Sequence, residues 1–236
     1  MKANTYTNTI QAEDIDLSGL TTIPSLYRKV MAAVGMNIRK EGHGIDVMAG
    51  RGMTWALARC GFEFTRRPEL YSEIQISVYR GEEDAICYGR NIEILDAERK
   101  LIGCGITHWC VLDINTHRPV ISRLESDLEP KKAGCRQPRR INLFSSDNEI
   151  VGQAGYSECD FNGHLNNCRY VDWFFNLLPE RITSSAGPVR LDVNFKTEIK
   201  RGAQILASIK ESGERQIDFC LRQSGSVACL ASLSIM

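Results

Sequence analysis

The sequence lacks the features that mark membrane proteins and metal proteins. No stretch approaches about 18 consecutive apolar residues, the length that would predict a transmembrane helix. The first residues, Met-Lys-Ala-Asn-Thr-Tyr-Thr-Asn, include no apolar signal region. No C-x-x-C pair occurs, and none of the four histidines stands in a metal-ligand cluster with a neighbouring cysteine. We therefore expect a cytoplasmic protein that acts away from membranes and uses neither a metal ion nor a cofactor.

The chain also lacks an excess of charge of either sign. Its 29 basic and 29 acidic residues cancel to a formal net charge of zero. Nucleic acids and anionic lipid surfaces attract proteins that carry surplus positive charge, so neither is an expected partner.

Cysteines are frequent but do not form a disulfide pattern. Nine occur without a repeated spacing, and an odd count argues against a disulfide framework. Six lie in strand-like apolar runs, where a thiol packs as a small hydrophobe in a reducing compartment. These are Cys60, Cys87, Cys104, Cys110, Cys220 and Cys229.

What is present is the composition of a globular protein that repeats one architecture. Hydrophobic residues make up 43% and charged residues 25% of the 236 positions. In the first half an extended segment at 6–13 precedes a helix, which Thr22 can cap and Pro24 can begin. We expect this helix to face the core through Ile23, Leu26, Tyr27, Val30, Met31 and Val34. After a glycine-rich loop at 42–52 come strand-like runs at 54–64, 73–79, 86–95 and 101–112.

The second half has the same order of elements. An extended segment at 150–158 precedes a helix from about Asn167, and strand-like runs follow at 189–196, 204–210, 216–222 and 226–235. Antiparallel strands around one long helix in each half predict an α+β fold. We expect an N-terminal unit at 1–125, a polar linker at 126–148 and a C-terminal unit at 149–236.

Only the second half carries a set of reactive side chains. Asp160, Asn162, His164, Asn166 and Asn167 occur within eight positions, immediately before the helix. Amides at a helix start can polarise a carbonyl, and an acid with a histidine can move protons, so the set predicts acyl-transfer chemistry. Helix capping and turn formation explain single members but not the whole set. Residues 14–21 of the first half contain neither His nor Asn, so we assign chemistry to the second unit and substrate shaping to the first.

This stretch resembles the catalytic loop of the fatty acyl-[acyl-carrier-protein] thioesterases. The resemblance lies in Asp160-x-Asn162-x-His164-x-Asn166-Asn167-x-x-Tyr170 followed by Trp173, in Val193-Asn-Phe-Lys-Thr-Glu198, and in Met53-Thr-Trp55-Ala-Leu-Ala-Arg59. It covers nearly the whole chain. It implies two tandem hot-dog units, each a long helix wrapped by an antiparallel sheet. It also implies a bacterial enzyme that hydrolyses the thioester of fatty acyl carrier protein, releasing free fatty acid and ending chain elongation.

The resemblance implies that Asp160, Asn162, His164 and Glu198 are catalytic. We expect amides around residues 165–167 to hold the thioester carbonyl, with Asn166 and Asn167 binding substrate. Glu198 is the expected base for water, and His164 shares the proton transfer. Asp160 either orients this set or attacks directly to give a mixed anhydride, and both routes stay open.

Three details qualify these assignments. Val189, Leu191, Val193 and Phe195 alternate, which places Glu198 on the polar face as a solvated carboxylate, so only the resemblance brings it into the site. Plant members carry a cysteine directly after the glutamate, where this chain has Ile199, so that cysteine mechanism cannot operate. Cys168 lies near the helix start, and we interpret it as helix packing rather than as a nucleophile.

A basic cluster in the linker has two interpretations. It could dock an acidic carrier protein, or it could be a solvated connection, which we favour. The cluster consists of Lys131, Lys132, Arg136, Arg139 and Arg140.

Other functions of the same fold remain alternatives. The nearest is an acyl-coenzyme A thioesterase, followed by a non-catalytic acyl-binding protein. A dehydratase is disfavoured by the Asn-rich helix start. Exposed sheet edges are compatible with a homodimer.

Overall fold

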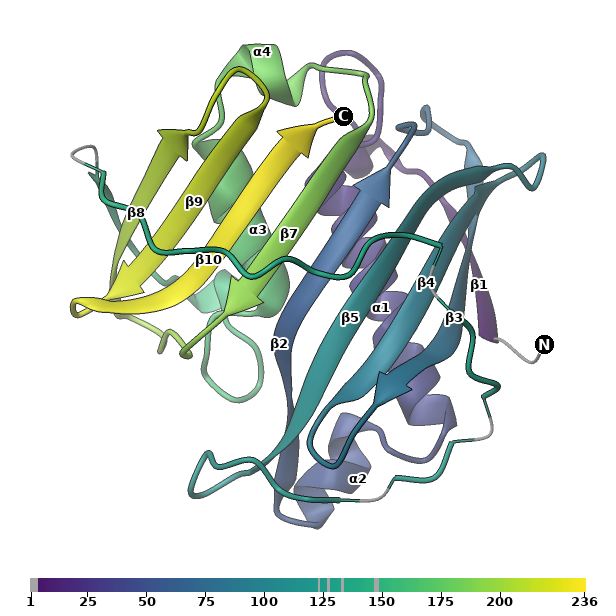
Figure 1. Cartoon of the computed structure of the whole chain (residues 1–236), viewed down its shortest axis with the longest axis vertical. Helices are drawn as coiled ribbons and strands as arrows, with labels where there is room; N and C mark the ends of the chain where they lie inside the picture. Colours follow the sequence, from purple (N-terminus) through teal and green to yellow (C-terminus); the bar gives the residue numbers. More distant parts are fainter. Residues whose placement is uncertain (1–3, 123, 127, 133, 147–148) are drawn as a thin grey trace. The chain divides into compact units, whose positions relative to one another are not determined.

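A computed structural model describes residues 4–122, 124–126, 128–132, 134–146 and 149–236. The chain forms two compact units, Met1–Pro138 and Arg139–Met236 (Figure 1). The stretch predicted as a linker is divided between them, since its part up to Pro138 belongs to the first unit. Its residues 127, 133, 147 and 148 lie outside the described residues.

The first unit wraps an antiparallel sheet around one long helix. Its strands follow the order β1-β3-β4-β5-β2, and each neighbouring pair is antiparallel. The helix α1 lies behind this sheet in Figure 1. The elements are β1 (Asn4–Thr9), η1 (Ala12–Asp14), α1 (Ile23–Lys40), α2 (Ile45–Gly50), β2 (Met53–Phe64), β3 (Glu73–Glu83), β4 (Tyr88–Asp96) and β5 (Leu101–Asp113).

The helix α1 begins where the sequence predicts. Thr22 caps it by accepting a hydrogen bond from the Ser25 amide at 3.2 Å, and Pro24 occupies the first turn. The predicted apolar stripe is buried, since all six of its residues are at most 8% exposed. Burying one such side chain contributes roughly 1.5–3 kcal/mol, so this stripe holds the helix to the sheet.

The second unit repeats this arrangement. Its strands follow the order β7-β10-β9-β8-β6 in antiparallel pairs, with α3 behind them in Figure 1. The elements are β6 (Glu149–Gln153), η2 (Tyr156–Glu158), α3 (Asn167–Asn176), α4 (Glu180–Thr183), β7 (Val189–Phe195), β8 (Gln204–Glu211), β9 (Gln216–Gln223) and β10 (Ser226–Ile235).

The apolar residues Trp173, Phe174, Leu177 and Leu178 form a stripe at helical spacing, and the helix α3 is shorter than this stripe. It ends at Asn176, so Leu177 and Leu178 of the stripe follow it. Within the helix, Phe174 is fully buried and stacks on Phe219 of β9, with ring centroids 5.1 Å apart. The aromatic contact fixes the C-terminal half of the helix against the sheet.

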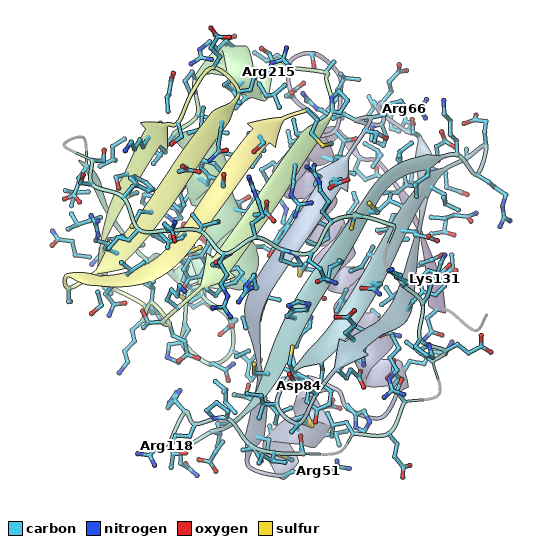
Figure 2. All side chains as sticks on the ribbon, viewed as in Figure 1. Arg51, Arg66, Asp84, Arg118, Lys131 and Arg215 are labelled. Carbon is cyan, nitrogen blue, oxygen red and sulfur yellow. The ribbon has the colours of Figure 1, made fainter. Side chains whose placement is uncertain are left out.

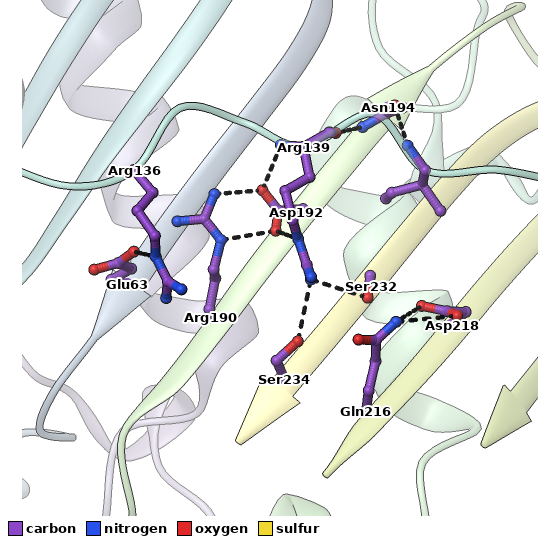
Figure 3. A network of polar contacts seen from close by, with 11 residues as sticks. Glu63, Arg136, Arg139, Arg190, Asp192, Asn194, Gln216, Asp218, Ser232 and Ser234 are labelled. Carbon is purple, nitrogen blue, oxygen red and sulfur yellow. Dashed lines mark hydrogen bonds and ion pairs between the residues drawn. The ribbon is translucent and has the colours of Figure 1, made fainter. Parts of the chain in front are cut away.

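The polar face of β7 is buried rather than solvated. Arg190 and Asp192 alternate with the apolar residues and form a bidentate ion pair, with both N–O distances at 2.8 Å (Figure 3). Arg139 adds a third contact, from its Nε to Asp192 Oδ2 at 2.7 Å. Asn194 accepts from the Ile141 amide and donates to the Arg139 carbonyl, so residues 139–141 cover this face.

Two short helices and two cysteines differ from the prediction. α2 occupies part of the glycine-rich loop and α4 follows α3; each is too short to show a periodic pattern. Cys87 lies before β4 rather than in a strand and is half-buried, and Cys110 is partly exposed. The prediction of burial is confirmed for Cys60, Cys104, Cys220 and Cys229.

Candidate active site

The reactive residues lie on a tight loop between η2 and α3. The Asp160 amide donates to the His164 carbonyl at 2.8 Å, and the Gly163 amide donates to the Asp160 carbonyl at 3.0 Å. Gly163 has φ +75°, a conformation that a side chain would strain. The sequence Asp-Phe-Asn-Gly therefore folds back on itself and presents His164 next to the start of α3.

A second segment pairs with this loop. The Leu165 amide donates to the Ile199 carbonyl at 2.8 Å, and the Arg201 amide donates to the Gly163 carbonyl at 2.9 Å. These bonds form an antiparallel bridge between His164 and Lys200. Residues 34 or more positions apart are thereby held in register, which brings Glu198 beside the histidine.

His164 and Glu198 are in direct contact. The imidazole Nδ1 lies 3.3 Å from Glu198 Oε2, and the two side chains are 16% and 42% exposed. β7 ends at Phe195, so Glu198 sits in the following loop and the alternation of the strand does not determine its direction. Glu198 is exposed, as the strand pattern predicts, and it also contacts the histidine, as the resemblance implies.

Asp160 and Asn162 contact each other through the backbone. Asp160 Oδ1 accepts a hydrogen bond from the Asn162 amide at 2.9 Å. Within the described residues, the Asp160 carboxylate forms no hydrogen bond or ion pair with His164 or Glu198. The Asn162 side chain is exposed on the same turn, which leaves it accessible to a ligand.

The start of α3 offers fewer amides than predicted. The Leu165 amide donates to Ile199, and the Asn166 amide donates to the Glu158 carbonyl at 2.9 Å. The Asn166 side chain caps the helix by accepting from the Cys168 amide at 2.9 Å. Of the three amides expected to hold a carbonyl, only that of Asn167 has no acceptor among the described residues.

Glu158 anchors the loop to the helix. Its Oε2 accepts from the Gly155 amide at 2.8 Å, and its Oε1 accepts from the Trp173 indole at 2.9 Å. The Trp173 ring in turn lies against Gly152 of β6, where an added Cβ would come within 2.1 Å of it. Both ends of the reactive loop are therefore fixed.

The two cysteines that flank the loop are Cys159 and Cys168. Burial and the carboxylates of Asp160 and Glu158 raise the pKa of the Cys159 thiol. Cys168 Sγ lies 3.2 Å from Asn167 Oδ1, as a donor. A thiolate nucleophile is therefore not favoured at Cys159.

Cations that border the site differ from those of the linker. Lys196, Lys200 and Arg201 are exposed within three positions of Glu198 and form no ion pair among the described residues. The Arg201 guanidinium lies over the Tyr156 ring at 4.8 Å.

Three of the five predicted linker cations are instead paired with the sheets. Lys131, labelled in Figure 2, contacts Glu93 at 2.6 Å, and Arg136 contacts Glu63 at 2.7 Å. Arg139 contacts Asp192, as described above. Much of the positive charge of the linker is thus neutralised within the chain.

The first unit contains the same loop with different side chains. Asp16 accepts from the Ser18 amide at 2.9 Å, Gly19 has φ +76°, and the Thr21 amide donates to the Pro68 carbonyl at 2.8 Å. Leu20 takes the place of His164, and Arg67 takes that of Glu198.

The polar groups of this first loop are bound by the buried Arg67 side chain. Arg67 is buried, forms an ion pair with Asp16 and donates to the carbonyls of Leu20 and Thr21. Among the described residues of this first loop, no exposed acid–histidine pair stands at the positions that correspond to His164 and Glu198.

Two classes of site are not found. Among the described residues, no group of three or more His, Cys, Asp and Glu side chains could hold a metal ion. In that same part of the chain, every helix is too short or too polar to cross a membrane.

Comparison with known proteins shows what the second unit is similar to. Residues 147–234 match the family model of the acyl-ACP thioesterase C-terminal domain. The predicted resemblance is confirmed. The chain is 18% identical over 216 residues to the oleoyl-acyl carrier protein thioesterase 2, chloroplastic, of Arabidopsis thaliana, covering 81% of this chain and 58% of that protein. It thus spans little more than half of the length of this relative.

Solved acyl-ACP thioesterases share the fold of both units. The enzyme from Bacteroides thetaiotaomicron VPI-5482 superposes with a TM-score of 0.90 at 22% identity, covering 99% of this chain and 98% of that one. The 12:0-ACP thioesterase of Umbellularia californica superposes with a TM-score of 0.85 at 16% identity, covering 99% and 97%. The predicted α+β fold of tandem hot-dog units is confirmed.

Some contacts of the second unit were not predicted from sequence. The Ile199 amide donates to the Tyr170 hydroxyl at 3.2 Å, and Glu158 bridges Gly155 to Trp173. Tyr170 and Trp173 belong to the motif that resembles the thioesterase catalytic loop, and this motif was the sequence signal for their importance. Glu158 and Ile199 carry no such signal, because backbone groups and a distant loop complete their contacts.

Proposed function

We propose that this protein hydrolyses the thioester of fatty acyl carrier protein and releases a free fatty acid. The observation that carries this is the contact of His164 with Glu198 in the unit that matches the thioesterase domain. The pair joins two segments that the sequence singles out independently. Catalytic roles for Asp160, Asn162, His164 and Glu198 remain part of this proposal.

The contact favours His164 as the base that activates water. When Nδ1–H donates to Glu198, the lone pair of the imidazole is on Nε2 and can accept a proton. Water loses that proton while its oxygen bonds to the thioester carbon, and the carbon–sulfur bond then breaks. The proton returns from Nε2 to the departing sulfur. Glu198 orients the ring, whereas the sequence alone favoured Glu198 as the base.

Two groups can donate hydrogen bonds that stabilise the thioester carbonyl oxygen when it becomes negative in this reaction. The Asn167 amide stands at the first position of α3, where the helix dipole favours negative charge. The exposed Asn162 side chain can donate from its amide group on the adjacent turn. Asn166 caps the helix, so its contribution is to form the site rather than to bind substrate.

The exposed cations next to Glu198 support a negatively charged carrier. A carrier protein is acidic and presents its acyl group on a phosphopantetheine arm, which Lys196, Lys200 and Arg201 would attract. Docking on the linker cluster is less favoured, because most of its cations are paired within the chain.

The test is free-acid release from a panel of acylated carrier proteins, with the same acyl chains on coenzyme A. We expect carrier-protein substrates to be hydrolysed faster, and replacing His164 with Ala to reduce kcat about 10²–10⁴-fold. His117→Gln and Glu214→Gln, both at exposed positions, are matched controls and should retain wild-type turnover. Faster hydrolysis of the coenzyme A esters would favour that handle instead. Binding without hydrolysis would identify an acyl-binding protein.

A further inference from the structure

We infer that Tyr170 is a positioning residue whose hydroxyl holds Glu198 against His164. The inference rests on the proposed function and concerns the same site. Tyr170 lies on α3, one turn beyond the reactive loop, and reaches the segment that carries Glu198.

The contact involves the residue directly after Glu198. Ile199 is fully buried, its amide donates to Tyr170 Oη at 3.2 Å, and its carbonyl accepts from the Leu165 amide at 2.8 Å. Both backbone polar groups of Ile199 are therefore satisfied, the amide by the helix α3 and the carbonyl by the loop that carries His164. A buried amide without an acceptor costs free energy. Loss of the Tyr170 hydroxyl would therefore favour a displacement of the segment that carries Glu198 and Ile199.

Tyr170 is itself held rigidly. It is 4% exposed and meets the Phe195 ring edge-on, with centroids 5.3 Å apart and planes at 86°. Burial raises the pKa of Tyr170 above its usual range, so the group that accepts from Ile199 is a neutral hydroxyl at any working pH.

The first unit supplies an internal comparison. There Pro68 takes the place of Ile199, because its carbonyl accepts from the Thr21 amide as that of Ile199 does from Leu165. Leu26 takes the place of Tyr170, four residues after the cap residue in each helix.

Proline has no amide proton, so the first unit has nothing for a hydroxyl to accept. The second unit thus has both the Tyr170 hydroxyl and the Ile199 amide, whereas the first unit, with Leu26 and Pro68, has neither. In that unit no acid–histidine pair depends on the segment. The coincidence links Tyr170 to the placement of Glu198 rather than to helix packing, which Leu26 accomplishes alone at 1% exposure.

The test is Tyr170→Phe, which keeps the ring and removes only the hydroxyl. We expect kcat to fall about 10–100-fold with KM changed little, since a small misplacement of a catalytic group costs this much. The acid limb of the pH–rate profile should move in the same direction as in Glu198→Gln. The matched control is Tyr27→Phe, a buried helix tyrosine whose ring meets Phe62 edge-on and whose hydroxyl contacts Cys60. It should leave kcat and the pH profile unchanged.

The ring nitrogens of His164, followed by ¹⁵N NMR, separate this inference from the proposed function. Tyr170→Phe should shift the Nδ1 signal toward its position in Glu198→Gln, whether or not the protein hydrolyses acyl carrier protein. No turnover by wild type would reject the proposed function and leave this measurement valid. An unchanged Nδ1 signal and an unchanged pH profile in Tyr170→Phe would overturn the positioning role.

Discussion

Asp160 forms the same contact as a residue that has no histidine beside it. Its Oδ1 accepts from the Asn162 amide, and Asp16 accepts from the Ser18 amide in the first unit, both at 2.9 Å. A contact that persists without the acid–histidine pair belongs to the turn. The geometry therefore supports Asp160 as a residue that shapes the loop. Orienting the reactive set and direct attack, the two routes that the sequence left open, both stay part of the proposal.

Substitutions at Asp160 separate shaping from nucleophilic attack. Asparagine can accept the same hydrogen bond, so we expect Asp160→Asn to retain kcat within roughly fivefold. Asp160→Ala removes the acceptor and should lower both activity and stability, the latter by about 1 kcal/mol. Single-turnover kinetics and thermal unfolding measure the two effects. A loss in Asp160→Asn as large as in His164→Ala would instead make Asp160 the nucleophile.

At the scale of residues, the sequence predicted which side chains meet in the site but not which backbone amides are available to a ligand. The motif pointed to His164 and Glu198, and the two are in contact. It did not show that the Leu165 and Asn166 amides are already bonded, because their acceptors are carbonyls of Ile199 and Glu158. The sequence specifies each side chain directly. The acceptor of a backbone amide depends on which distant segment the fold places beside that amide.

At the scale of elements, the close approach of Trp173 to Gly152 joins α3 to β6. An added Cβ would lie 2.1 Å from the indole ring. The same indole donates to Glu158, whose carbonyl accepts from the Asn166 amide at the helix start. The glycine thus lets one aromatic ring fix the helix, the strand and the reactive loop together.

Two glycine-to-alanine changes should have opposite effects. Gly152→Ala forces the Trp173 ring to move, which we expect to cost about 1–3 kcal/mol and to lower turnover. Gly35→Ala lies on the exposed side of α1 with nothing within 4 Å, so it should stabilise by about 0.5–1 kcal/mol. Thermal unfolding should shift by about 2–4 °C per kcal/mol, downward and upward respectively. Equal behaviour of the two variants would show that Gly152 is not tightly packed.

The element boundaries were predictable where caps and period were both present. Thr22 and Asn166 cap the two long helices at the predicted positions. α2 was missed because Gly44 and Gly50 flank only a single turn and a half, which is too short for a period to appear. The polar face of β7 was predicted to be solvated, and the strand pattern cannot reveal that residues 139–141 cover it.

At the scale of the whole molecule, a net charge of zero conceals an uneven distribution. The linker cations are mostly paired, whereas Lys196, Lys200 and Arg201 are exposed beside the candidate site. Composition alone drew attention to the longer run of basic residues in the linker. Ion pairing, which only the fold determines, moves the expected contact for an acidic carrier to the second unit.

Charge reversal tests this placement. Lys200→Glu with Arg201→Glu should lower kcat/KM for acyl carrier protein roughly 10-fold or more at low salt, with a smaller effect at high salt. Hydrolysis of an acyl-pantetheine without the protein carrier should change little. The matched control, Lys132→Glu with Arg140→Glu, reverses two exposed linker cations and should leave kcat/KM unchanged. The opposite ranking of the two double variants would return docking to the linker.

The buried Arg67 has a consequence for how the two halves tolerate change. Its guanidinium binds Asp16 and two carbonyls of the loop at residues 16–21. This loop of the first unit therefore stabilises the fold instead of presenting reactive groups. Random substitutions there should be selected against through misfolding, and those around His164 through lost chemistry. Two turns of similar backbone geometry in one chain would thereby be sensitive to substitution for different reasons, one for stability and the other for activity.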